Sequence, residues 1–263
     1  MNLTRRDTLK FGLASAAGVG TMMVMPFHAR AAMSEGDSYM GDTGEITVHP
    51  ISHASFVMTA PGVVIYADPV GDPVQYDGYP APDLILVTHE HGDHYKADTL
   101  AALAGDGTRL VTNPAVHAML PDALKAKATA IGNGESHTEG SVGIEAIPAY
   151  NITEGRTQFH PQGRDNGYVL TVDGKRIYIS GDTEDIPEMR ALTGIDLAFV
   201  CMNLPFTMDA NQAASAVAEF APTVVYPYHY RGRDNGTQDP AEFARLLGEA
   251  GGEAEVVSGP WYG

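Results

Sequence analysis

The chain has 263 residues, with 33 acidic against 16 basic side chains and a formal net charge of −17. Such acidity disfavours nucleic acids and anionic membranes as partners, because phosphate contacts need a basic surface. A single cysteine, Cys201, excludes an internal disulfide, and its place in an apolar run predicts a buried, unreactive thiol.

Residues 1–31 have the pattern of an export signal. Basic residues in segment 5–10 precede the uncharged stretch 11–27, and Ala29-Arg30-Ala31 supplies small residues for cleavage. Paired arginines followed by Leu-Lys resemble the twin-arginine signal, although Thr8 stands where that motif usually has Phe. A membrane anchor is the alternative, but glycines and a proline interrupt the stretch. We therefore expect a periplasmic protein without a stable membrane anchor.

The remaining residues predict one domain. The signal segment carries a net charge of +3, so the rest of the chain is left with −20. A polar lead, residues 32–44, precedes a domain expected over residues 45–263, in which no Pro/Ser-rich linker occurs.

Strand patterns dominate the start of this domain. Glu45–Ile51 and Ala54–Thr59 alternate between apolar and polar residues, and Gly62–Ala67 is a short apolar run. Leu84–Val87 is a run of branched aliphatic residues, typical of a strand buried on both faces. The next segments predict a helix at Lys96–Ala104, a strand at Arg109–Thr112, a short helix at Asn113–Leu120 and a strand at Val142–Pro148.

A long polar loop, Asn151–Asn166, leads into a second series of strands and helices. Asp173-Gly174 is a strong hairpin signal between strands expected at Tyr168–Val172 and Arg176–Ser180. Helices are then expected at Ile186–Leu192, Ala210–Phe220 and Pro240–Ala250, and strands at Asp196–Met202, Thr223–Tyr228 and Glu253–Val257. Two mixed sheets packed face to face with helices outside would satisfy this pattern, an α/β (α+β) class.

The residues directly after Leu84–Val87 carry the clearest chemical signal. His89 and His91 are two apart on an extended segment, so their rings project to the same side. Asp93 and His94 follow at once. Three imidazoles and a carboxylate within six residues suit zinc or a similar divalent ion, whereas a merely solvated polar loop rarely ends a buried strand.

Further ligands must come from later in the chain, because one segment cannot close a metal site. Two apolar strands end in suitable residues, Asp182 in Gly181-Asp182-Thr183 and His229 in Pro227-Tyr228-His229. Alone, an Asp after a strand is as often a turn or cap residue, but the two together support a metal centre.

Thr88-His89-x-His91-x-Asp93-His94, Gly181-Asp182-Thr183 and Pro227-x-His229 resemble, in order and spacing, the ligand motifs of the metallo-β-lactamase superfamily. The resemblance runs from Glu45 to the C-terminus, and His53–Phe56 with Asp68-Pro69 is similar to the branch that includes ascorbate-6-phosphate lactonase. It implies a four-layer αββα sandwich and two metal ions. The implied ligands are His89 and His91 for the first ion, Asp93, His94 and His229 for the second, and Asp182 between them.

The third ligand of the first ion departs from the superfamily pattern. A His is usual where this chain has Asn151, a poor zinc ligand, and His160 nine residues later is the replacement we favour. This departure leaves open whether the two divalent ions are zinc, which we expect, or manganese or iron.

These residues imply a hydrolase acting on a small molecule. Two divalent ions would generate hydroxide from a bound water, for attack on an ester, lactone or phosphoester, with Asp93 orienting the nucleophile. We expect substrate contacts from His53, Arg164 and Tyr228, although Arg164 could instead pair with Asp165. The alternative function is a non-catalytic metal-binding protein that retains the fold.

Overall fold

The structure, a computed structural model, describes residues 36–232 and 236–262. The expected export signal, residues 1–31, therefore lies outside the described residues. Within the described part, every helix is too short or too polar to cross a membrane.

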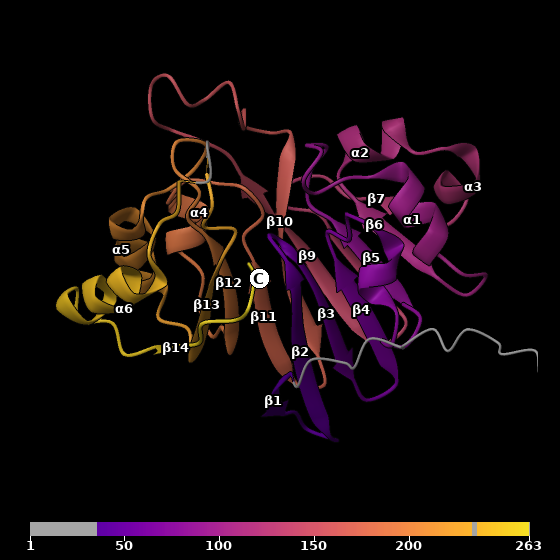
Figure 1. Cartoon of the computed structure of the whole chain (residues 1–263), viewed down its shortest axis with the longest axis horizontal. Coiled ribbons are helices and arrows are strands. Elements are labelled where there is room, and N and C mark those ends of the chain that lie inside the picture. Colours follow the sequence, from indigo (N-terminus) through magenta and orange to yellow (C-terminus); the bar gives the residue numbers. More distant parts are fainter. Residues whose placement is uncertain (1–35, 233–235, 263) are drawn as a thin grey trace, which may run out of the picture. The chain divides into compact units, whose positions relative to one another are not determined.

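Two seven-stranded sheets form the centre of the folded unit (Figure 1). The first sheet, in spatial order, contains β1 (Asp37–Met40), β2 (Glu45–Ser52), β3 (Ser55–Ala60), β4 (Val63–Ala67), β5 (Leu84–Val87), β6 (Arg109–Thr112) and β7 (Ala128–Ala130). The second contains β14 (Glu255–Val256), β13 (Val224–Tyr228), β12 (Leu197–Cys201), β11 (Lys175–Ile179), β10 (Asp165–Val172), β9 (Val142–Ala149) and β8 (Ser136–Glu139).

Both sheets follow one plan. Strands β1 to β4 pair antiparallel and β4 to β7 pair parallel. Strands β8 to β11 and then β11 to β14 repeat that order. The N-terminal half (residues 36–130) and the C-terminal half (residues 136–262) thus each supply one mixed sheet.

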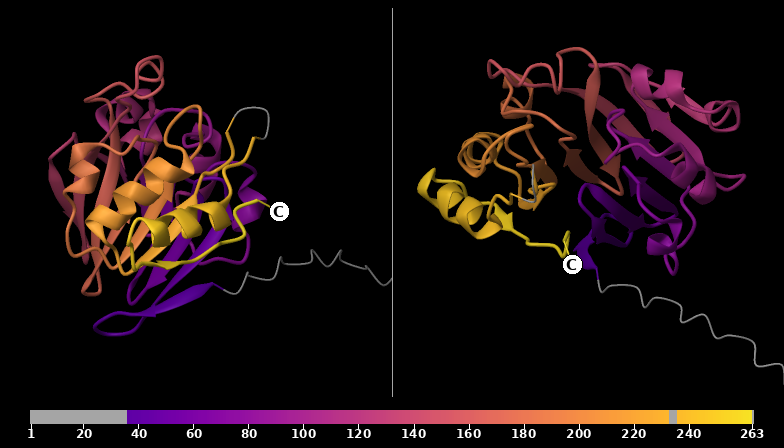
Figure 2. Two further views of the ribbon diagram at one scale, coloured as in Figure 1. Left: turned by 90° about the vertical axis from the view of Figure 1, so that its left-hand side faces the viewer. Right: turned by 45° about the horizontal axis from the view of Figure 1, so that its top comes forward.

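Helices cover the outer face of each sheet. The N-terminal half contributes η1 (Pro73–Tyr76), α1 (Ala97–Leu103), α2 (Pro114–Met119) and α3 (Asp122–Lys125), and the C-terminal half contributes α4 (Pro187–Arg190), α5 (Ala210–Phe220) and α6 (Pro240–Glu249). In Figures 1 and 2 the two helix groups lie on opposite sides of the paired sheets. The expected αββα sandwich is therefore confirmed.

Strand β5 shows how the sequence specifies these layers. Leu84 and Leu86 pack in the large core that includes residues of both sheets, whereas Ile85 and Val87 pack in the smaller core with helix residues such as Leu100. All four strand residues are buried, as the aliphatic run predicted. Burial of each such side chain contributes about 1.5–3 kcal/mol, which anchors the strand that leads into the histidine cluster.

The N-terminal boundary of the domain was predicted too late. Strand β1 lies in the segment expected to be a polar lead, and it pairs with β2 at the edge of the first sheet. Its alternation between half-buried and exposed residues is short and carries few apolar side chains, so the sequence pattern is weak. Strands β7 and β8 and helix α3 were also missed, and β14 is shorter than the predicted Glu253–Val257.

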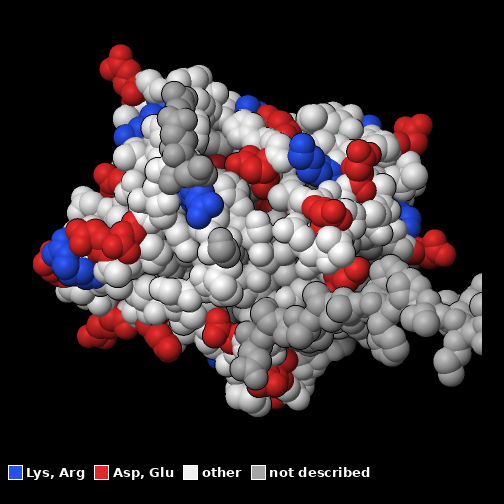
Figure 3. Space-filling view, in the orientation of Figure 1, with Lys and Arg blue, Asp and Glu red and all other residues white. Residues whose placement is uncertain are grey.

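Charged side chains are mainly at the surface. Figure 3 shows acidic side chains spread over the face seen in Figure 1, with basic ones standing beside or between them. Strands β4, β5, β11 and β13 all end at one edge of the sandwich. The predicted metal ligands that follow β5, β11 and β13 therefore lie at this edge.

Candidate metal centre

Four of the predicted metal ligands come from one turn after β5. The N–H of His94 donates to His91 O at 2.9 Å, which folds the segment back on itself. His89 Nε2 lies 3.1 Å from His91 Nδ1, and the rings of His89 and His94 have centroids 4.0 Å apart. His89 and His94 are fully buried, whereas the Asp93 side chain is 47 % exposed. The turn thus combines buried imidazoles with a solvent-facing carboxylate.

Strand β11 delivers Asp182 to this turn. Gly181 precedes it with a φ of +59°, and a Cβ there would lie 2.7 Å from Asn166 O and 3.1 Å from the Thr88 Cβ. Only glycine fits this space and this backbone conformation, so the end of β11 packs directly against the start of the turn. Asp182 is buried, with its Oδ1 3.4 Å from His94 Nε2.

His229 directly follows strand β13. Its φ of 45° is in the left-handed region, and its N–H donates to His53 O at 3.1 Å. His229 Nε2 lies 3.3 Å from Asp182 Oδ1 and 3.5 Å from Asp93 Oδ2. One ring nitrogen therefore faces carboxylates from both halves of the molecule.

The loop between β9 and β10 brings His160 to the same place. His160 Nε2 lies 3.4 Å from Asp182 Oδ2, and its ring is 4.8 Å from the His91 ring between centroids. On the other side, His160 Nδ1 lies 3.2 Å from Asp165 Oδ2, and both residues are buried. A carboxylate behind a histidine in this way fixes the ring orientation and directs the second nitrogen outward.

Asn151 lies beside His160, but its side-chain amide ties the loop together. Nδ2 of Asn151 donates to Arg156 O at 3.0 Å and to Phe206 O at 2.6 Å. Its backbone N–H donates to His160 O at 2.8 Å, while its Oδ1 has no hydrogen-bond partner among the described residues. The geometry favours His160 over Asn151 as the third donor beside His89 and His91.

Asp68 is a supporting residue whose role the sequence did not reveal. It follows β4, is fully buried and has a φ of 41°. Its Oδ2 lies 2.7 Å from His94 Nδ1, and its carboxylate accepts from the backbone N–H of Thr88 at 2.8 Å. Asp68 thereby turns His94 Nε2 toward Asp182. The only sequence signal was an Asp-Pro pair after an apolar strand.

His53 reaches the site from the β2–β3 turn. Its Nε2 lies 3.2 Å from Asp93 Oδ2, and its Nδ1 lies 2.8 Å from the hydroxyl of Tyr262. The N–H of His53 donates to Trp261 O at 3.1 Å. The C-terminal segment therefore holds His53 in place, a contact between residues 209 apart that no local pattern indicates.

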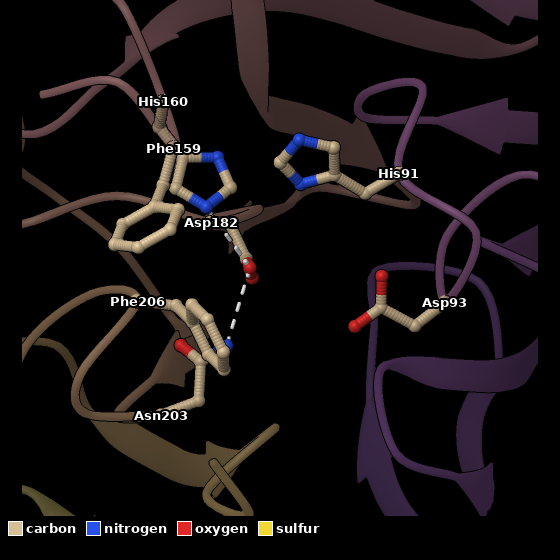
Figure 4. A pocket seen from close by; sticks show the side chains of 7 residues that line it. All are labelled: His91, Asp93, Phe159, His160, Asp182, Asn203 and Phe206. Atoms are coloured by element: carbon tan, nitrogen blue, oxygen red, sulfur yellow. Dashed lines mark hydrogen bonds and ion pairs between the residues drawn. The ribbon is translucent and has the colours of Figure 1, made fainter. Parts of the chain in front are cut away.

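A pocket of about 210 Å³ opens above these groups (Figure 4). It is lined by His91, Asp93, Phe159, His160, Asp182, Asn203 and Phe206. Asn203, Phe159 and Phe206 were not predicted. Asn203 Nδ2 lies 3.2 Å from Asp182 Oδ2 and 3.1 Å from His229 Nε2, and its Oδ1 accepts from the Thr207 hydroxyl.

Burial and charge set the protonation of the cluster. Burial lowers the pKa of His89 well below its ordinary value, which leaves the imidazole neutral. Burial opposes a charge on His94 too, but the Asp182 and Asp68 carboxylates raise the pKa of His94 well above its ordinary value. Against burial, His229 and His94 hold the pKa of Asp182 well below its usual range. A divalent cation would replace the proton on His94 and pair with Asp182.

The donor set fits metal ions. Donor atoms lie within 4.8 Å of one another in three groups, His89/His91/His160, His53/Asp93/His229 and His89/His94/Asp182. His94 Nε2 and Asp182 Oδ1 are buried 3.4 Å apart and make no hydrogen bond among the described residues, so a cation bound between them would give both a closer partner. Imidazole nitrogens with carboxylate oxygens suit zinc and related ions. The His and Asp clusters are therefore able to bind metal.

Two of the expected substrate contacts do not line this pocket. Tyr228 is fully buried, and its ring packs at 5.6 Å from that of Trp261, because residues before His229 on β13 lie in the core. Arg164 pairs instead with Glu90 at 3.0 Å and with Asp165 at 2.7 Å. Neither residue lines the pocket.

Comparison with known proteins identifies relatives over most of the chain. Residues 47–229 match the family model of the β-lactamase superfamily domain. A UPF0173 metal-dependent hydrolase from Thermococcus kodakarensis is 35 % identical over 179 residues, 66 % of this chain and 77 % of the relative. Another from Pyrococcus abyssi is 31 % identical over 224 residues, 81 % of this chain and 95 % of the relative.

A solved structure described as a metal-dependent hydrolase, from Parabacteroides distasonis, aligns with a TM-score of 0.76 and 40 % identity, covering 86 % of this chain and 99 % of that protein. Sequence, fold and donor geometry agree. The chain belongs to the β-lactamase superfamily, as a metallo-β-lactamase-fold, metal-dependent hydrolase related to the UPF0173 proteins.

Proposed function

We propose that the protein hydrolyses a small-molecule carboxylic ester or lactone with two divalent ions, preferably zinc, held between its two halves. The observation that carries this proposal is the meeting of His and Asp donors from both halves at the base of a solvent-accessible pocket. The first ion would be held by His89, His91 and His160, the second by Asp93, His94 and His229, with Asp182 between them.

The bound ions would supply an activated water as nucleophile and polarise the substrate carbonyl. Asp93, half exposed in the pocket, is placed to accept a hydrogen bond from the attacking water and so to orient it. His53 steadies the Asp93 carboxylate at 3.2 Å. Asn203 Nδ2 donates to Asp182 Oδ2 at 3.2 Å and so holds that carboxylate in place beside the cluster.

The charges around the pocket favour a carboxylic ester or lactone over a phosphoester. Among the described residues, no lysine or arginine lines the pocket. Arg164 is occupied by Glu90 and Asp165, and Arg156 Nη1 lies 2.9 Å from the buried Glu184. A phosphate group would therefore find no side-chain cation, whereas a neutral carbonyl needs none.

A metal-dependence assay on a substrate panel tests this proposal. Protein purified without a His-tag would be assayed with several lactones and with bis-(p-nitrophenyl) phosphate, before and after chelation and after return of zinc, manganese or iron. We expect lactone hydrolysis that chelation abolishes and metal restores. His89→Ala should remove this activity, whereas His117→Ala, on α2 outside the cluster, should retain it.

Two outcomes would reject the proposal. If chelation changes neither stability nor hydrolysis, the metal-dependent mechanism is wrong. If the protein binds metal tightly but hydrolyses none of the panel, the result supports the alternative of a non-catalytic metal-binding protein.

A further inference from the structure

One wall of the pocket is aromatic. Phe159 comes from the β9–β10 loop and Phe206 from the segment between β12 and α5. Their rings meet edge to face with centroids 5.1 Å apart at 84°. Figure 4 shows both rings on the side of the pocket opposite His91 and Asp93. A substrate bound between the two sides would therefore place its reacting carbonyl at the donors and an adjoining group against the phenyl rings.

The loop that carries Phe159 is firmly anchored. The fully buried Glu184 accepts hydrogen bonds from the N–H groups of Ile152 at 2.7 Å and Thr153 at 2.6 Å. The same carboxylate pairs with Arg156 at 2.9 Å, and Arg156 also donates to Thr207 O at 3.2 Å. Since Thr207 adjoins Phe206, this network joins the two segments that hold the rings. The aromatic wall is thus built into the fold.

The dimensions of the pocket limit what the wall can contact. A dry cavity of about 150 Å³ accommodates a benzene molecule. The pocket of about 210 Å³ has room for one such ring together with the reacting group. The two arginines of the loop, Arg156 and Arg164, are both paired with carboxylates, so an anionic substituent has no free cationic side chain there.

We propose that Phe159 and Phe206 select uncharged esters or lactones that carry a compact aromatic or branched apolar group beside the scissile bond. This inference rests on the proposed hydrolase function and names its substrate class. In the reaction, water adds to the carbonyl carbon, the bond from that carbon to the ester oxygen breaks, and the leaving oxygen takes a proton. The products are one carboxylic acid and one hydroxyl group.

Three lactones distinguish the contributions of ring and charge. Dihydrocoumarin carries a fused aromatic ring, δ-valerolactone has the same lactone ring without it, and isocitric lactone carries carboxylates. Phe159→Ala and Phe206→Ala should each lower kcat/KM for dihydrocoumarin about tenfold, mainly through KM, because a small apolar contact is worth about 10–200-fold in specificity. The same variants should change kcat/KM for δ-valerolactone by less than about twofold, since that substrate makes fewer contacts with the rings.

Matched variants distinguish the loss of substrate contact with the rings from a general loss of protein stability. Phe159→Leu and Phe206→Leu keep an apolar wall and should retain most of the dihydrocoumarin activity. Ile152 lies on the same loop and is 53 % exposed. Ile152→Ala should therefore leave the preference for dihydrocoumarin over δ-valerolactone unchanged. Equal losses on dihydrocoumarin and δ-valerolactone in the Phe→Ala variants would overturn the proposal, as would a wild-type preference for isocitric lactone.

A binding measurement keeps this inference separate from the proposed function. Benzamide titrated into the zinc-loaded protein, observed by ligand NMR, should bind saturably to the wild type and weaken about tenfold in each Phe→Ala variant. Absence of lactone hydrolysis would contradict the proposed function, and the benzamide titration would still decide the role of the wall. Benzamide binding that is absent, or unaffected by both substitutions, would overturn the inference.

Discussion

The two halves of the molecule build their sheets on the same plan but deliver metal donors in different ways. In the N-terminal half, one turn after β5 carries His89, His91, Asp93 and His94 within six residues. In the C-terminal half, His160, Asp182 and His229 arrive separately, from a loop and from the ends of two strands. The first set is folded by hydrogen bonds within the turn, whereas the second is brought together by the packing of strands and by the contact of His160 with Asp165.

Because the donors come from both halves, the site is complete only when the two sheets are packed against each other. His229 Nε2 faces Asp93 of the other half at 3.5 Å, and His160 Nε2 faces Asp182 at 3.4 Å. Asp182 in turn lies 3.4 Å from His94 of the turn. A metal bound among these atoms would join the two halves, so substitutions in either half should disturb the same ions.

Asp182→Asn should have the largest effect, because Asp182 approaches donors of both halves. Loss of its charge would weaken the binding of both ions. Activity should fall with it, because metal ions contribute several kcal/mol of transition-state stabilisation. We expect kcat/KM for a lactone to fall at least about a thousandfold, which corresponds to ~4 kcal/mol. Metal content by mass spectrometry should fall with it. A variant that keeps both full metal content and activity would break the proposed link between the halves.

The third donor of the first ion gives the next largest expected effect. His160→Ala should reduce bound zinc from about two ions to about one, because a site with only His89 and His91 lacks its third protein ligand. Asn151→Ala should keep the metal, since its amide bonds to loop carbonyls. Zinc titration of both variants by calorimetry shows whether His160 or Asn151 is the third ligand of the first ion. The reverse result would assign the role to Asn151.

The sequence predicted the parts of the site that local patterns encode. The β5 run and the histidines after it could be recognised because the buried strand and the ligand spacing both lie within the eleven residues 84–94. Asp182 and His229 were found because each ends an apolar strand. Phe159, Asn203 and Phe206 were missed because their importance depends on which segments meet in three dimensions. Tyr228, expected to contact substrate, is buried instead, because every residue of β13 lies in the core.

Asp68 tests whether the N-terminal turn needs support beyond its own hydrogen bonds. Its carboxylate holds His94 at 2.7 Å, so Asp68→Asn should weaken metal binding about 10–100-fold, the usual effect of removing a carboxylate behind a ligating histidine. Asp106→Asn, at an exposed position of the same half, is the matched control. Competition with a chromophoric chelator measures both affinities. Equal affinities in the two variants would show that the turn orients His94 unaided.

Tyr262→Phe should have the smallest effect. It keeps the ring but removes the hydroxyl, which accepts from the Arg231 N–H at 3.2 Å and makes the hydrogen bond to His53 Nδ1 at 2.8 Å that concerns the site. Such a bond is worth about 0.5–1.5 kcal/mol, so we expect a two- to tenfold loss of kcat, roughly, with metal content unchanged. Steady-state kinetics beside metal analysis would check this. Loss of metal in this variant would mean that the C-terminal segment supports the centre itself and not only His53.

Anomalous diffraction at the zinc edge, from crystals of the zinc-loaded protein, tests the central claim most directly. The account predicts two peaks on either side of Asp182, one beside His89, His91 and His160 and the other beside Asp93, His94 and His229. A single peak held by the N-terminal turn alone, or peaks away from Asp182, would contradict a centre shared by the two halves.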